Sequence, residues 1–185
     1  SVKDEIRRIV KESEEANRDV VEKIRRNVER IRRKVERVVE EIKRIVKEVK
    51  EKVEDVVRKN KEKGERIKKL VTDVEREVER VVEEIRRIAE KVTDVHRRVA
   101  EESKRSADED KKTVDRVVER VDKAEEEVVR KLLEEVKKSS DESKDRSRRL
   151  LEEVNRISRD VERKLEELLR KVEKVVRDLE EELRR

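Results

Sequence analysis

The feature that most constrains this chain is an apolar position that recurs every 18 residues. The series 10, 28, 46, 64, 82, 100, 118, 136, 154 and 172 holds Val throughout, apart from Gly64 and Ala100. Eighteen residues in five turns give about 3.6 residues per turn, the period of a straight α-helix. A heptad started at Val2 fails at Lys23. The sequence therefore predicts long, nearly straight helices.

Composition excludes the classes of fold that need tight turns. The 185 residues include one Gly and no Pro, Phe, Trp or Tyr. A sandwich, a barrel or a doubly wound sheet needs many Gly and Pro residues in its turns, and this chain lacks them. Charged residues are 59% of the chain, but opposite charges nearly cancel to +5 and the apolar residues are periodic, which argues against disorder.

The sequence contains no targeting signal and no cysteine. No apolar run exceeds two residues, so we expect a soluble chain without a signal peptide, another targeting signal or a membrane span. The absence of Cys excludes disulfides, a thiolate nucleophile and a Cys-based zinc site.

Two local signals divide the chain into near-equal thirds. Gly64 is the residue type that commonly ends a helix in the left-handed conformation. Asp122 and Glu125 have the residue types of a capping box. We therefore predict helices over about 2–60, 65–121 and 123–184, within one domain of residues 1–185.

Polar residues interrupt the apolar stripe once in each third. If the chain reverses near 62 and 123, antiparallel neighbours across each turn have residue numbers with a constant sum. Residue 13 then lies beside about 111 and 135, and residue 17 lies beside about 107 and 139. All the interruptions then share one level, which we call the polar band. Its predicted members are Ser13, Asn17, Ser103, Ser106, Asp110, Thr113, Ser139, Ser140, Ser143 and Ser147.

This coincidence predicts an all-α fold, an antiparallel three-helix bundle. The alternative is one continuous helix in a parallel coiled-coil oligomer, in which the three polar clusters would lie far apart along the axis. We expect a monomer that requires no partner, with self-association as the alternative.

The chain resembles de novo designed helical bundles, in particular untwisted three-helix bundles built on an 18-residue layer. The resemblance rests on the 18-residue step from Val10 to Val172, on the Glu/Lys/Arg surface around Val35–Ile42, and on the lack of Met, Pro and aromatic residues. It covers the whole chain and brings no catalytic or binding motif. It implies a hyperstable scaffold made by recombinant cytoplasmic expression.

No constellation of residues indicates an enzyme or a metal site. His96 is the only imidazole, and neither a nucleophile nor further metal ligands accompany it in sequence. Paired carboxylates such as Glu83 and Glu84 fall on the solvent side of the stripe, where they support the helix. We expect no cofactor and no catalytic residue.

Nucleic acid and membranes are not expected partners either. Arg32, Arg33 and Lys34 supply some positive charge, but no aromatic side chain offers a stacking platform for bases. The same lack removes the residues that anchor amphipathic helices at a membrane surface.

The polar band is the one candidate site. It can be a buried hydrogen-bond network that fixes register, a small polar cavity for a ligand or ion, or a loosened segment. The sequence accordingly predicts a structural scaffold without native activity, and the alternative is a binding or self-assembly module that uses the band.

Overall fold

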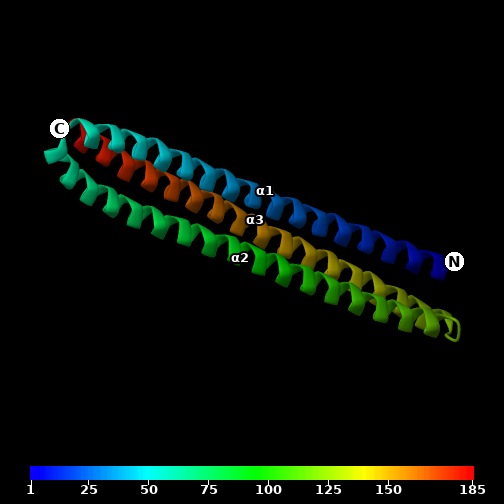
Figure 1. Cartoon of the computed structure of the whole chain (residues 1–185). Coiled ribbons are helices and arrows are strands. Elements are labelled where there is room, and N and C mark those ends of the chain that lie inside the picture. The colour runs from blue at the N-terminus through cyan, green and yellow to red at the C-terminus, as the bar shows by residue number, and fades with distance from the viewer. The chain divides into compact units, whose positions relative to one another are not determined.

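The chain forms three long α-helices and no strand (Figure 1). The computed structural model describes residues 1–185. Helix α1 spans Val2–Lys59, α2 spans Lys61–Val121 and α3 spans Glu126–Arg184. The predicted all-α three-helix bundle is confirmed, and the chain is not one continuous helix.

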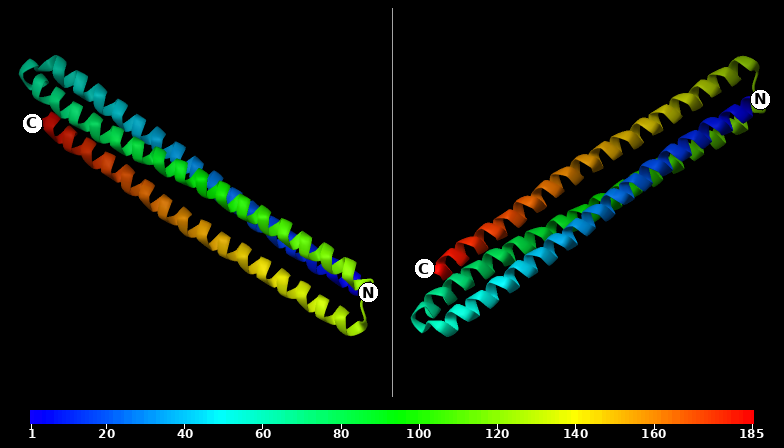
Figure 2. Two further views of the ribbon diagram at one scale, coloured as in Figure 1. Left: turned by 90° about the horizontal axis from the view of Figure 1, so that it is seen from below. Right: turned by 90° about the horizontal axis from the view of Figure 1, so that it is seen from above.

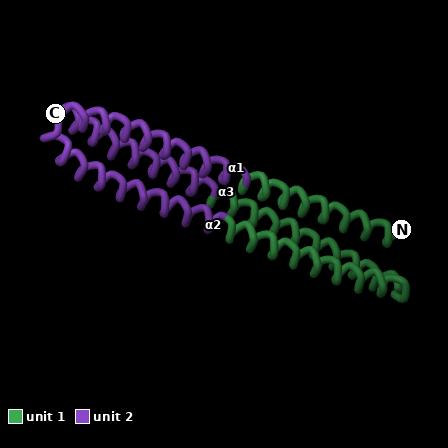
Figure 3. The backbone as a smooth tube through the Cα atoms, in the orientation of Figure 1, with its two compact units in different colours: residues 1–28, 93–157 green, residues 29–92, 158–185 purple.

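Each helix contributes to two compact units, which Figure 3 distinguishes by colour. Unit 1 comprises residues 1–28 and 93–157, and unit 2 comprises residues 29–92 and 158–185. Each unit therefore contains one stretch of α1, one of α2 and one of α3.

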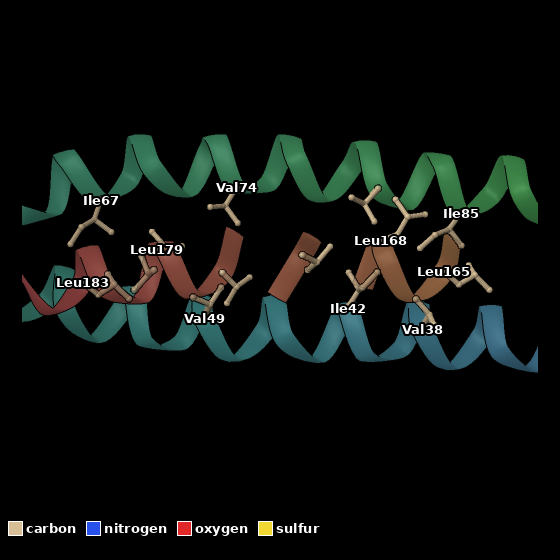
Figure 4. Close-up of a cluster of buried hydrophobic side chains, with 14 residues drawn as sticks. Val38, Ile42, Val49, Ile67, Val74, Ile85, Leu165, Leu168, Leu179 and Leu183 are labelled. Carbon is tan, nitrogen blue, oxygen red and sulfur yellow. The ribbon is translucent and has the colours of Figure 1, made fainter. Parts of the chain in front are cut away.

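In unit 2, three helical stretches enclose a continuous apolar core. Buried Val, Ile and Leu side chains from all three helices meet there, among them Ile42, Ile67, Ile85 and Leu165. Figure 4 shows the labelled side chains directed into the space between the helices. Most of these Val and Ile side chains belong to α1 and α2, whereas α3 contributes mainly Leu. The apolar stripe inferred from the sequence is thus the buried face.

Ion pairs at the rim of unit 2 report the direction of each helix. Lys50 of α1 pairs with Glu75 of α2 at 3.4 Å, and their residue numbers sum to 125, close to the 124 expected for a turn centred at 62. Lys34 of α1 pairs with Glu166 of α3 at 2.9 Å. Two further pairs, Lys164 with Glu84 and Lys171 with Glu77, show that residue numbers fall along α2 as they rise along α3, so these two helices are antiparallel. Figure 2 shows the same opposite direction for α2 and α1.

In unit 1 the apolar core is divided into two smaller clusters. One contains Ile6, Val117 and Val136, and the other contains Ile24 and Val154 with their neighbours. The polar band lies between them along the helices, since its α1 members are residues 13 and 17. The interruption of the sequence pattern is therefore an interruption of the core.

The prediction that Gly64 ends a helix is wrong. No glycine has a positive φ, and Gly64 lies in the first turn of α2. Asn60 separates the helices instead, because its Oδ1 accepts a hydrogen bond from the Lys63 backbone N–H at 3.2 Å, as a helix N-cap does. Gly64 is buried at this turn, where an added Cβ would meet Val57 Cγ1 at 3.4 Å.

The predicted capping box at the second turn is also wrong. Helix α3 begins at Glu126, and residues 122–125 connect it to α2. The Asp122 carboxylate pairs with Lys3 of α1 rather than with the start of α3. A turn centred at 123 would pair residues of α2 and α3 whose numbers sum to 246. The connection is longer than predicted, and paired residues such as Arg98 and Glu153 have numbers that sum to 251.

None of the three helices combines the length and the apolar character needed to cross a membrane.

Candidate polar site in unit 1

All ten predicted members of the polar band lie in unit 1. Those on α1 and α3 are the most buried: Ser13, Asn17, Ser140, Ser143 and Ser147 are each no more than 9% exposed. The members on α2 and Ser139 are half-buried. The band therefore crosses the interior of the unit and reaches its surface beside α2.

Asn17 is the centre of a small buried hydrogen-bond network. Its Nδ2 donates to Ser143 Oγ at 3.3 Å, and its Oδ1 accepts a hydrogen bond from the Ser147 hydroxyl. One amide on α1 thus uses its donor and its acceptor on two hydroxyls one turn apart on α3.

This pairing displaces α3 from its predicted register. Residue 17 is predicted beside about 139, but its hydrogen-bond partners are residues 143 and 147. The shift has the direction expected from the longer second connection. The exposed pair of Asn27 and Asn155, with 2.6 Å between Nδ2 and Oδ1, shows a similar offset.

The α2 members make different contacts. Thr113 Oγ1 donates to the Glu109 carbonyl of its own helix at 3.1 Å. Asp110 Oδ1 lies 3.6 Å from Arg146 Nη2 of α3, an ion pair between helices. The hydrogen-bonded part of the band is therefore formed by α1 and α3, and α2 is joined to it by charge.

A cavity of about 810 Å³ lies beside this network. Ala100 and Ala107 line it, as do Val10, Val114 and Val136, so small side chains of α2 leave space between apolar walls. Exposed charged residues at its edge, such as Glu14 and Lys104, show that it opens to solvent. Seven predicted band members line it: Ser13, Asn17, Ser103, Asp110, Thr113, Ser139 and Ser140.

Four buried polar atoms of the band have no hydrogen-bond partner in the protein. They are the hydroxyl oxygens of Ser13, Ser106 and Ser140, and Oδ2 of Asp110. Buried polar groups are nearly always paired with protein or water, because an unpaired one costs about 1–3 kcal/mol. Three of these residues, Ser13, Asp110 and Ser140, line the cavity, which can supply the missing partner.

One carboxylate at the cavity edge has a perturbed titration. Hydrogen bonds from the Arg25 guanidinium lower the pKa of Glu22, with a further contribution from the charge of Arg26. Glu22 therefore stays ionised to lower pH than an isolated glutamate and keeps negative charge at the mouth of the cavity.

The remaining candidate, His96, lies apart from the buried network. It is half-buried and lines a hollow of about 370 Å³ with Thr93, Arg97, Glu101 and Lys104. No group of three or more His, Cys, Asp or Glu side chains is placed to hold a metal ion.

Some polar residues at helix contacts lie outside the predicted band. Ser158 of α3 is 1% exposed in unit 2, although it lies outside the predicted band. Asn27 and Asn155 each adjoin a buried Val, at positions 28 and 154, and this adjacency is the signal that could have paired them.

Comparison with known proteins adds no relative: no family model, no curated protein and no solved structure matches this chain.

Proposed function

We propose that this chain is a structural scaffold of the de novo designed type, with no reaction of its own. The observation that carries the proposal is that nearly all of its large apolar side chains are packed inside the two units. The apolar stripe packs within each unit, and only Val21 and Val128 are large apolar side chains with substantial exposure, at 40% and 43%. Little apolar surface is left for an obligate partner.

The charged surface supports the same proposal. Many ion pairs join residues three or four apart on one helix, such as Glu41 with Arg44 at 3.0 Å. Others join helices within a unit, such as Arg30 with Glu162 at 3.1 Å. Exposed pairs of this kind contribute only a few tenths of a kcal/mol each, so they favour helix formation and register rather than chemistry.

The oligomeric state tests the scaffold proposal. We expect sedimentation equilibrium to give the mass of one chain, 22.4 kDa, at every concentration and at low and high salt. A mass that rises with concentration would contradict a monomeric scaffold and favour self-assembly. Val21→Lys and Val128→Lys are the matched variants, because loss of association in either would identify the exposed apolar side chain responsible.

A second candidate function is the binding of a small ligand in the cavity of unit 1. The specific observation that favours it is the conjunction of an open cavity of about 810 Å³ with the unpartnered hydroxyls of Ser13 and Ser140. Ligand sites commonly combine such a volume, apolar walls and a few polar groups. Ser140→Leu tests it, since a larger side chain there should block any ligand that the parent protein binds.

A further inference from the structure

We propose that the cavity of unit 1 recognises small organic ammonium ions that carry an apolar body. The inference rests on the second candidate function, binding in this cavity, and adds the charge and shape of the ligand. Its elements are an unpartnered carboxylate oxygen, two unpartnered hydroxyls and apolar walls.

The sign of the ligand charge follows from Asp110. This residue lines the cavity, and its Oδ2 is buried without a hydrogen-bond donor. Arg146 approaches the other oxygen, Oδ1, at 3.6 Å, so Oδ2 is left without a donor. An ionised carboxylate only accepts hydrogen bonds, and an ammonium group only donates them, so the two are complementary.

The surrounding charges have the same sign preference. Five carboxylates line the cavity, against three cationic side chains, although the whole chain has a net charge of +5. One of the cations, Arg18, lies 3.9 Å from Glu14 on the same helix and is partly neutralised by it. Arginines also pair with Glu22 and Asp110, so the acidic excess of the lining rests on the exposed carboxylates of Asp19 and Asp108. Exposed carboxylates at the opening attract cations rather than anions.

The buried serines complete the polar end of the site. Ser13 on α1 and Ser140 on α3 are 6% and 8% exposed, line the cavity, and have unpartnered hydroxyl oxygens. Serine hydroxyls rotate among staggered positions, so each can turn an oxygen lone pair toward a ligand N–H. Three acceptors from three helices match the three donors of a primary ammonium group.

The walls select the rest of the ligand. Val10, Val114 and Val136 provide apolar surface, and Ala100 and Ala107 leave room beside it. An alkyl chain or ring attached to the ammonium group removes this surface from water, which stabilises the complex in proportion to the apolar area that is buried. A bare inorganic cation would gain nothing from these walls.

The test is an NMR titration with three ligands that share one carbon chain: hexylammonium, hexanol and hexanoate. At low ionic strength we expect hexylammonium to shift the amide signals around Ser13, Asp110 and Ser140. We expect hexanol to bind more weakly than hexylammonium, and hexanoate to bind most weakly of the three. Asp110→Asn should weaken hexylammonium binding by about tenfold or more, because a charge-assisted hydrogen bond is lost. Asp145→Asn removes the same charge from a residue paired with Arg148 outside the cavity and should change nothing.

The outcomes separate the two levels of the proposal. If hexylammonium and hexanol bind equally, or if Asp110→Asn has no effect, cation recognition is overturned while cavity binding stands. If none of the three ligands shifts these signals, both the ammonium site and the binding function are overturned. If Ser140→Leu leaves hexylammonium binding intact, the ligand occupies another place and the proposed site is wrong.

Discussion

Asn17 of α1 and Ser143 of α3 are joined by a buried hydrogen bond of 3.3 Å from Nδ2 to Oγ. Ser143 is completely buried, and Asn17 is 9% exposed, so the bond lies in the interior of unit 1. The bond fixes two parallel helices at one axial position, because a slip of one residue would leave an amide and a hydroxyl unpaired in the interior.

Replacing Asn17 by Ala should therefore destabilise the protein. The change leaves the hydroxyls of Ser143 and Ser147 without their partner, and we expect a loss of about 1–3 kcal/mol in the free energy of unfolding. Urea denaturation measures it. Asn27→Ala is the matched control, because it breaks an exposed amide pair with Asn155 and should cost less than about 0.5 kcal/mol. Equal effects would contradict the burial of the Asn17 network.

Two neighbouring serines of α3 should respond in opposite directions to the same substitution. Ser140→Val replaces an unpartnered hydroxyl by methyl groups beside an open cavity, so we expect a gain of about 1 kcal/mol. Ser143→Val removes the acceptor of the Asn17 amide and should destabilise. Thermal unfolding of both variants compares them, and a gain from Ser143→Val would refute the network.

Gly64→Ala distinguishes the observed first turn from the one predicted by the sequence. Gly64 is helical with a negative φ, and a Cβ would lie at ordinary contact distance from Val57. We expect a gain of about 0.5–1 kcal/mol, because alanine loses less backbone freedom in a helix. A left-handed conformation would instead make alanine unfavourable by about 1–2 kcal/mol. Chemical denaturation gives the sign directly.

Hydrogen exchange should find the weakest helical hydrogen bonds at the polar band. The core of unit 1 is divided there, and Ala100 and Ala107 of α2 line the cavity. Local opening is easier where few apolar contacts are lost, so amides of residues 103–113 should exchange faster than those of residues 78–88 of the same helix. Uniform protection along α2 would rule out a loosened segment.

The dependence of stability on pH should be confined to acid. A hydrogen bond from Lys34 lowers the pKa of Glu166 from its ordinary value of 4.5, and Arg25 does the same for Glu22. A lowered folded pKa gives a stabilising contribution that is present above the unfolded value and is lost as pH falls through the folded one. We therefore expect stability to be nearly constant from about pH 5 to pH 9 and to fall below about pH 4.5.

Lys34→Met isolates one of these contributions. The variant keeps an apolar stem of similar length and removes the ammonium group, so the pKa of Glu166 should rise toward its ordinary value in a carboxyl NMR titration. Lys50→Met is the control, since the partner of Lys50 is Glu75. An unchanged Glu166 titration in Lys34→Met would show that the ion pair does not form in solution.

The sequence predicted those parts of the structure that periodicity controls. Spacings of three and four residues placed Ile24, Val81 and Leu165 on the buried faces of helices, because apolar residues at these spacings share one side. Reflection through the two turns placed residues 17, 107 and 139 at one level, and Asn17, Ala107 and Ser139 do line one cavity in unit 1.

Tertiary structure decided the positions of the turns and the axial register. The break at Asn60 instead of Gly64, and the start of α3 at Glu126, depend on which local contacts form where the chain reverses. Periodicity cannot choose between registers, since a slip of three or four residues keeps apolar faces together. Directional hydrogen bonds can, and for that reason the pairing of Asn17 with Ser143, and the hydroxyls left unpartnered beside the cavity, emerged only from the packed helices.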